Sequence, residues 1–395
     1  MRPGRLVKAD YPWRFGVFLA MYYACNGIWQ GYAALYFKST GLPTHLRSVI
    51  MACTPLVSIF MQPVWGAVAD RSRSRNAVLR GLIAFSLIMA LAYQVSRAFA
   101  WLLVCCALFS ACYTSIQPLG DSILLEGLAP RNHPFGPIRM MGTLTFALTN
   151  LLWGLLLDEA HMYLVVYATA AMLGLVLIAT KVLPAVPGHQ SGGGRRMNMT
   201  AILRIPHMKG LMLLMLMLQL TYGYFYCFFS EHFLSLPGAS NALVGLCYFI
   251  SACSEVPFLL NCDRLYEKLG AGKLLCISSV ALTLRWTLLA VTGNAYVAMA
   301  SQVLHGWGFI VMTVTMAKYM SDVIPDELKA SGQMLIGVVG FGIARTFGIL
   351  GGGFVASFMG GIRMGFAMMA IVAGVTMLLF VPKYARGKPL NGRGE

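Results

Sequence analysis

The chain carries the stretch LVGLCYFISACSEVPFLL at residues 243–260, followed by LLCISSVALTLRWTLLAV at 274–291 and AYVAMASQVLHGWGFIVMTVTMAKY at 295–319. Each stretch is apolar and about long enough to cross a bilayer as a helix, which takes about 20 residues. Near its centre each holds one ionisable residue: Glu255, Arg285 and His305. An ionisable group at that depth costs several kcal/mol unless it is paired or hydrated, so we interpret all three as functional. An acid, a permanent cation and an imidazole at one depth predict a polar cavity in which a proton moves.

The composition of the whole chain supports a membrane protein. Hydrophobic residues make up 58% of the 395 residues, charged residues 11%, and the mean hydropathy is +0.70, values that a soluble domain of this length would not show. Apolar runs without strand-like alternation predict helices, because a helix satisfies its own backbone in lipid. We therefore expect an all-α membrane protein with twelve transmembrane helices in two pseudo-symmetric six-helix bundles. The expected spans are 13–37, 45–68, 77–95, 101–125, 138–157, 162–183, 207–233, 241–262, 272–292, 295–319, 330–356 and 362–382.

The net charge of +16 has a one-sided distribution. Most Lys and Arg residues fall in the N-terminal, even-numbered inter-helix and C-terminal segments, which places both termini in the cytoplasm of a protein of the cell (inner or plasma) membrane. These basic segments suit anionic lipid headgroups, so the expected partner is the bilayer and not nucleic acid. The ten cysteines lie in or beside spans without a CxxC pair, which favours buried packing. We expect no metal and no cofactor.

A polar, basic, Gly-rich segment at 184–206 separates the halves. We expect a six-helix bundle at 1–183, a cytoplasmic linker at 184–206, a second bundle at 207–383 and a cytoplasmic tail at 384–395. The pair Asp263-Arg264 follows the second span of the second half as Asp70-Arg71 follows the second span of the first. This weak match indicates duplication of a six-helix unit and predicts a binding site where the halves meet near the midplane.

The first half holds two pairs of candidate binding residues. Asn26 and Gln30 share one face of the helix 13–37, where they either line a cavity or join two helices as hydrogen-bonding residues. Asp121 and Arg139 lie nine residues to either side of Pro130, which places them at one depth of a helical hairpin. We expect these two to pair, either at the substrate or as a structural ion pair.

The second half adds two further candidates. Tyr226 belongs to an aromatic-rich helix, where a ring can stack on a planar substrate. Arg345 lies near the middle of the span 330–356, as a cavity cation for an anionic substrate or as the partner of a neighbouring acid. The sequence leaves both roles open.

Residues 66–76, GAVADRSRSRN, resemble the loop signature of the major facilitator superfamily: a glycine, three residues, Asp-Arg and then basic residues. Arg73 stands where that signature has a small residue. In the superfamily this loop is a conformational latch, and we expect Gly66 to allow helices to approach closely there. The resemblance implies a latch at Gly66, Asp70, Arg71, Asp263 and Arg264.

Five further stretches are similar to one branch of the superfamily, the group of the lactose permease, the nucleoside–proton symporter and the phenylpropionate permease. They are LVSIFMQP at 56–63, FGPIRMMG at 135–142, SEVPF at 254–258, LRW at 284–286 and QVLH at 302–305. The resemblance implies that Asp121 and Arg139 match the sugar-binding acid and arginine of the lactose permease. It also implies that Glu255, Arg285 and His305 match its substrate and proton-coupling residues.

One position departs from this branch. The lactose permease has a glutamate three residues after the histidine, and here that position is Gly308. A coupled proton would then travel on Glu255, Asp121 or His305. Motion that separates Glu255 from Arg285 would favour protonation of the acid, and their return would favour release. The missing acid also leaves room for an uncoupled facilitator.

We therefore expect a monomeric secondary transporter that works by alternating access. Its substrate would be a small polar or aromatic organic solute of the sugar, nucleoside or aryl-carboxylate type, moved in symport with protons. The alternatives are a proton-coupled efflux antiporter of the same fold and an uncoupled facilitator. The sequence carries no HExxH, no GxSxG and no pair of aspartates at metal spacing, so we do not expect an enzyme.

Overall fold

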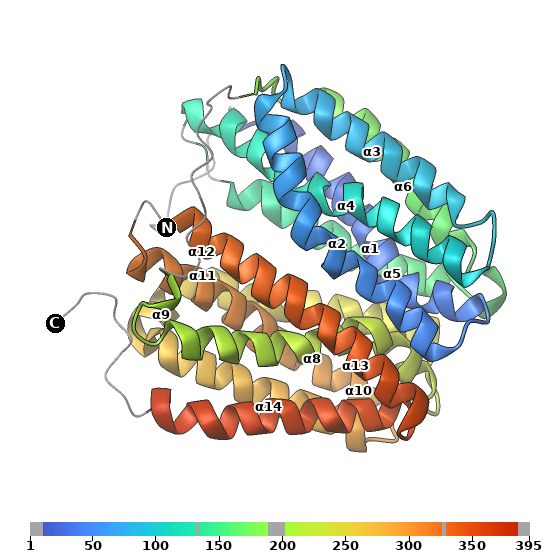
Figure 1. The fold of residues 1–395 in the computed structure, drawn as a ribbon, viewed down its shortest axis with the longest axis vertical. Coiled ribbons are helices and arrows are strands. Elements are labelled where there is room, and N and C mark those ends of the chain that lie inside the picture. The colour runs from blue at the N-terminus through green and yellow to red at the C-terminus, as the bar shows by residue number, and fades with distance from the viewer. Residues whose placement is uncertain (1–10, 132, 134, 189–201, 326–328, 386–395) are drawn as a thin grey trace. The chain divides into compact units, whose positions relative to one another are not determined.

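The computed structural model describes residues 11–131, 133, 135–188, 202–325 and 329–385 (Figure 1). The regular elements within these ranges are helical. The chain divides into two compact units, the first formed by residues 1–42 and 56–193 and the second by 43–55 and 194–395. The beginning of the second helix therefore clusters with the second unit, and its remainder with the first.

Six helices begin in the first half of the chain. They are α1 (Arg14–Ser39), α2 (Thr44–Arg71), α3 (Arg75–Ala92), α4 (Phe99–Leu128), α5 (Gly136–Leu156) and α6 (Leu164–Ala179). The second half contains α8 (Met208–Leu234), α9 (Asn241–Val291), α10 (Ala295–Ala300), α11 (Val311–Val323), α12 (Lys329–Ile336), α13 (Arg345–Phe358) and α14 (Gly361–Ala385).

Nine helices in the described ranges are long and apolar enough to cross a membrane. One of them, α9, consists of two arms joined at Gly270, whose left-handed backbone (φ 72°) breaks the helix. The helices α1 and α5, with 26 and 21 residues, are long but are not among the nine. Counting the arms of α9 separately and adding α1 and α5 gives twelve long helical segments in the described chain, in agreement with the sequence prediction.

In the first unit, α1 packs against α5 and α6. Two of its aromatic rings lie on glycines of neighbouring helices. A Cβ atom at Gly120 would lie 2.5 Å from the ring of Phe18, and one at Gly142 would lie 2.5 Å from the ring of Tyr23. These glycines let α4 and α5 approach α1 closely, which positions the polar face of α1.

In the second unit, α8 and α13 run side by side (Figure 1). A Cβ atom at Gly348 would lie 2.0 Å from the carbonyl oxygen of Leu220, and one at Gly223 would lie 2.4 Å from that of Arg345. The two backbones therefore touch through glycines. The helical path is also widened into π-helical segments at Gly306–Ile310 and Gly337–Ala344. Such segments are frequent at functional sites.

The contact between α8 and α13 predicts that a substitution at one glycine of α13 lowers the stability of the protein, whereas the same substitution at another does not. Gly348→Ala forces a methyl group against the Leu220 carbonyl, and such overpacking destabilises a core by about 1–3 kcal/mol. The matched control is Gly351→Ala on the same helix, where a Cβ atom meets nothing within 4 Å. Thermal unfolding of the purified protein in detergent should show a lower midpoint for Gly348→Ala alone. Equal midpoints for the two variants would contradict the close approach.

Candidate functional site

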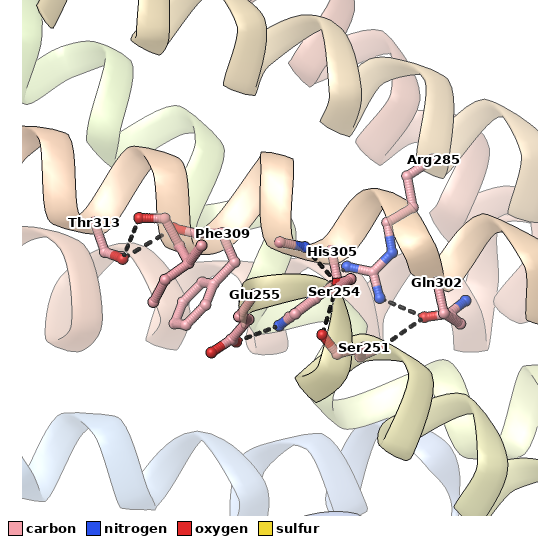
Figure 2. A network of polar contacts seen from close by, with 10 residues as sticks. Ser251, Ser254, Glu255, Arg285, Gln302, His305, Phe309 and Thr313 are labelled. Atoms are coloured by element: carbon pink, nitrogen blue, oxygen red, sulfur yellow. Dashed lines mark hydrogen bonds and ion pairs between the residues drawn. The ribbon is translucent and has the colours of Figure 1, made fainter. Parts of the chain in front are cut away.

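A buried polar network in the second unit joins the three ionisable residues that the sequence singles out (Figure 2). His305 Nε2 lies 3.3 Å from Glu255 Oε1, and its Nδ1 lies 2.8 Å from Arg285 Nη1. Arg285 also donates through Nη2 to Gln302 Oε1, which accepts a further hydrogen bond from Ser251 at 3.4 Å. Arg285 is 0% exposed, and the side chain of Glu255 is 17% exposed. The network thus leads from a fully buried cation to a partly accessible acid.

His305 stands between the acid and the guanidinium. The coupling hypothesis involves a state in which Glu255 and Arg285 come together, and no ion pair joins them in the described chain. Arg285 instead meets His305, Gln302 and, at 4.3 Å from its Cζ, the ring of Phe225. In this conformation the imidazole of His305 lies between the two charges.

The hydrogen bonds determine the tautomer of His305. A guanidinium can only donate, so Nδ1 must accept with its lone pair. Nε2 then carries the proton and donates it to Glu255. A second proton on Nδ1 would break the bond from Arg285, so the imidazole is neutral in this arrangement.

Two glycines of the Gly306–Ile310 segment hold His305 in place. A Cβ atom at Gly306 would lie 2.0 Å from the carbonyl oxygen of Ser254, whose hydroxyl accepts the Gly306 N–H at 2.8 Å. The backbone after His305 therefore touches the residue before Glu255. At Gly308, a Cβ atom would lie 2.6 Å from Leu282. A side chain has no room at the position where the lactose permease has its glutamate.

Arg345 lies close to this network. Its Nε donates to Gln219 Oε1 at 3.2 Å, and its Cζ lies 4.8 Å from the ring of Phe341 and 5.0 Å from that of Tyr226. Within the described residues it forms no ion pair with a carboxylate. The sequence leaves two roles open for Arg345. The structure of the second unit does not show one of them, an ion pair with a neighbouring acid.

In the first unit, Arg139 lies over an aromatic ring. Its Cζ is 4.2 Å from the ring centroid of Tyr23, and the described chain contains no ion pair between Arg139 and Asp121. Asp121 Oδ1 and Arg139 Nη1 are both buried without a hydrogen-bond partner. The expected ion pair is thus not formed within the described residues, and the face of the guanidinium packs on Tyr23 of α1 instead. The acceptor Asp121 Oδ1 and the donor Arg139 Nη1 therefore have no hydrogen-bond partner among the described residues.

The polar face of α1 is partly used for packing. Asn26 Nδ2 donates to Gln30 Oε1 at 3.4 Å, and Asn26 Oδ1 accepts from the hydroxyl of Tyr113 at 3.3 Å. Tyr113 belongs to α4 and stacks on Phe109 with ring centroids 4.7 Å apart. Asn26 therefore links α1 to α4, and Gln30 supports it. The sequence analysis did not single out Tyr113, because an isolated tyrosine in a span carries no signal.

The loop between α2 and α3 contains a charge cluster that sequence reasoning identified only in part. Asp70 Oδ1 lies 2.5 Å from Arg75, and the same guanidinium lies 3.0 Å from Glu126 of α4. The side chain of Arg75 is only 7% exposed, whereas Arg71 is exposed. A Cβ atom at Gly66 would meet nothing within 4 Å. The expected close approach at Gly66 is therefore wrong, and Arg75 forms the buried centre of the cluster.

The corresponding residues of the second half lie in a similar setting. Asp263 forms an ion pair with Lys318 of α11, whose ammonium lies 4.9 Å from the ring centroid of Tyr266. Arg264 is exposed. In both loops the aspartate is paired and the arginine directly after it faces outward.

A further ion pair lies within the second unit. Arg47, near the start of α2, lies 2.6 Å from Glu231 near the end of α8, with side chains 10% and 15% exposed. Sequence reasoning missed Arg47, because a cation at the start of a span is normally solvated among headgroups. The sequence could have indicated this pair, because both residues lie at the ends of predicted spans on the same side of the membrane.

The hydrogen bonds of His305 predict a spectroscopic signature. In purified protein with ¹⁵N-labelled histidine at pH 7, a signal with an unprotonated Nδ1 and a protonated Nε2 should disappear in His305→Gln, while the signal of His232, whose Nε2 donates to Leu289, remains. Arg285→Gln should shift this signal, because Nδ1 loses its donor. A signal for His305 with both nitrogens protonated would contradict the assigned tautomer.

Comparison with known proteins identifies the family of this chain. The sequence matches the MFS_1 like family over residues 12–367. It is 27% identical to the maltose permease of Geobacillus stearothermophilus, over 85% of this chain and 86% of that protein. It is 23% identical to the probable 3-phenylpropionic acid transporter of Escherichia coli (strain K12), over 91% and 94%.

The crystal structure of the nucleoside transporter NupG has the same fold, with a TM-score of 0.82 at 17% identity, over 95% of this chain and 99% of that one. The relatives named here are transporters and not enzymes. The apolar helices of the described chain and its similarity to these relatives show that the protein is a multi-pass membrane transporter. It belongs to the MFS_1 like family, within the major facilitator superfamily.

Proposed function

We propose that the protein is a secondary transporter that moves a small polar or aromatic organic solute by alternating access, in symport with protons. The observation that carries this proposal is the buried network of Glu255, His305 and Arg285 inside apolar spans. Such a network costs free energy in a protein that only spans the bilayer, so a role in ion movement accounts for it. The positive-inside charge distribution supports a multi-pass protein of the cell membrane with both termini in the cytoplasm, and the proposed transporter works as a monomer.

Glu255 is the proton carrier in this proposal. The Nδ1 atom of His305 accepts from Arg285 and cannot take a proton while that bond lasts. Gly308 leaves no space for a second acid beside the network. Glu255 is the acid at the accessible end, and one of its oxygens already meets the Nε2 proton of His305. The negative charge of Glu255 attracts the Arg285 guanidinium through the intervening imidazole. Protonation of Glu255 would remove this attraction and would therefore loosen this part of the second unit.

In the first unit, Asp121 and Arg139 are the proposed substrate-binding residues. Asp121 Oδ1 and Arg139 Nη1 are buried and lack partners, so a hydroxyl or amide group of a substrate could satisfy both. Aromatic rings in each unit, such as Tyr23 and Tyr226, could stack on a sugar, a base or an aryl ring. The names of the relatives cover maltose, 3-phenylpropionic acid and nucleosides, which fits this range of solutes.

The loop charge clusters have a mechanical role in the proposal. Asp70 with Arg75, and Asp263 with Lys318, would hold helix ends in one conformation and release them in the other. Among the described residues, Gly66, Arg71 and Arg264 make no contact that supports a part in the latch.

The role of Glu255 is tested by Glu255→Gln. Sugars, nucleosides and aryl carboxylates are first screened by thermal stabilisation of the purified protein, and a stabilising solute is then followed in proteoliposomes. The variant should keep solute exchange near the wild-type rate and lose accumulation driven by a pH gradient, because the amide cannot carry the proton. Glu267→Gln, at an exposed acid of the same helix, should accumulate solute normally.

Unchanged accumulation by Glu255→Gln would refute this coupling. If the wild-type protein expels solute when protons enter, it is an antiporter. If it equilibrates solute without accumulation at any pH gradient, it is an uncoupled facilitator.

The role of Asp121 is tested by Asp121→Asn. A hydrogen bond to a charged group contributes about 1.5–3 kcal/mol, so loss of the carboxylate should weaken solute binding by roughly 10- to 100-fold. Asp158→Asn, at an exposed acid that pairs with His161, serves as the control. Calorimetric titration of both variants with the stabilising solute checks the expectation. Equal affinities would remove Asp121 from the proposed binding surface.

A further inference from the structure

Within its helices, the second unit contains one more cation than the nearby acids can balance: Arg285 is buried and Arg345 is partly exposed. Arg285 and Arg345 are both positive, Glu255 is negative, and the hydrogen bonds of His305 make it neutral. The other described acids of this unit are engaged or exposed: Glu231 pairs with Arg47, Asp263 pairs with Lys318, and Glu267 and Asp322 are exposed. The cluster therefore carries a net charge of one positive unit among apolar spans, where such a charge is costly without a counterion.

Arg345 holds the unbalanced charge. Its Nε donates to Gln219, and its guanidinium lies over Tyr226, Phe341 and, at 5.8 Å, Phe309. The two terminal nitrogens of Arg345 have no hydrogen-bond partner among the described residues. They form the fork that binds a carboxylate with two parallel hydrogen bonds.

Two buried groups next to Arg345 also lack a partner. Gln219 is 0% exposed and its Nε2 donates to no described group, while its Oε1 is fixed by the bond from Arg345. The hydroxyl of Tyr222, also 0% exposed, lies near both Arg285 and Arg345 and makes no well-formed hydrogen bond among the described residues. Tyr222 shares two neighbours with Arg345, because its ring stacks on Tyr226 at 6.0 Å and meets Phe309 at 5.1 Å.

These unused groups are all able to donate, and the surrounding rings provide apolar faces. A buried donor without an acceptor is destabilising, so the arrangement is complete only when an acceptor-rich group enters. A carboxylate supplies both the acceptors and the missing negative charge. A planar or aryl body attached to it would lie against the rings of Tyr226, Phe309 and Phe341.

We propose that Arg345, the amide of Gln219 and the hydroxyl of Tyr222 bind the carboxylate of an organic monoanion with a planar or aryl body. The proposal rests on the transport function proposed above and narrows its substrate class from polar solutes in general to anions. The movement of one such anion with one proton is electroneutral. A membrane potential set with potassium and valinomycin should therefore leave accumulation unchanged, whereas symport of a neutral solute would respond to it.

The binding test compares each carboxylate with its uncharged amide on the purified full-length protein in detergent. The pairs are sodium 3-phenylpropionate and 3-phenylpropionamide, sodium benzoate and benzamide, and sodium indole-3-acetate and indole-3-acetamide. At least one carboxylate should raise the unfolding temperature, and its amide should bind at least about tenfold more weakly, since a charged hydrogen bond contributes about 1.5–3 kcal/mol. If no carboxylate stabilises the protein more than its amide, the proposal is overturned.

Variants then locate the effect. Arg345→Gln should lose roughly 10- to 100-fold in affinity for the anion and the preference over the amide. Arg345→Lys should keep part of both. Gln219→Glu places a carboxylate beside Arg345 and should abolish anion binding without removing the cation, which keeps the test valid if Arg345→Gln fails to fold. Arg363→Gln is the control, because Arg363 is exposed and bonds only the carbonyls of Ala290 and Val291.

The outcomes separate this inference from the transport proposal. If carboxylates bind through Arg345 but no solute crosses a vesicle membrane, the anion site stands and transport fails. If a neutral sugar or nucleoside is accumulated and binds Arg345→Gln as well as the wild type, transport stands and the anion site is overturned.

Discussion

The arrangement of the second unit depends on how one guanidinium, that of Arg285, is stabilised among apolar helices. Arg285 is fully buried, and its terminal nitrogens are satisfied by His305 and Gln302, neither of which is charged here. Its face rests on the ring of Phe225. Since the arginine uses the lone pair of His305, the imidazole keeps its proton on the side of Glu255. The acid and the cation are thereby linked through a neutral ring.

Glycines make this arrangement possible. The backbone at Gly306 touches the residue before Glu255, and Gly308 lies against Leu282 without room for a side chain. Gly348 brings α13 against α8, and Arg345 extends from the first turn of the same helix. The glycine at 308 also shows how this chain differs from the lactose permease that it resembles. The space for an acid there is filled by packing against Leu282, so the proposed mechanism assigns the proton to Glu255.

Each unit contains buried polar atoms that no described group satisfies. Asp121 Oδ1 and Arg139 Nη1 lie in the first unit, and Gln219 Nε2 and the Tyr222 hydroxyl lie in the second. Native structures leave few such groups, and those that remain often mark the place of a water, an ion or a ligand. This common feature underlies both proposals. The first cluster offers an acceptor and a donor, whereas the second offers donors beside an unbalanced cation.

The sequence by itself determined the helical membrane architecture, the family and the position of the ionisable residues within apolar spans. Apolar runs of bilayer length have no other stable form in lipid, and hydropathy locates Glu255, Arg285 and His305 to within a helical turn. Only the tertiary structure decided which groups touch. Arg139 packs on Tyr23 and forms no ion pair with Asp121 among the described residues, and Arg75, not Arg71, pairs with Asp70. Such contacts depend on the rotation of each helix about its axis and on spacings of an ångström or two, which side-chain packing sets and composition does not record.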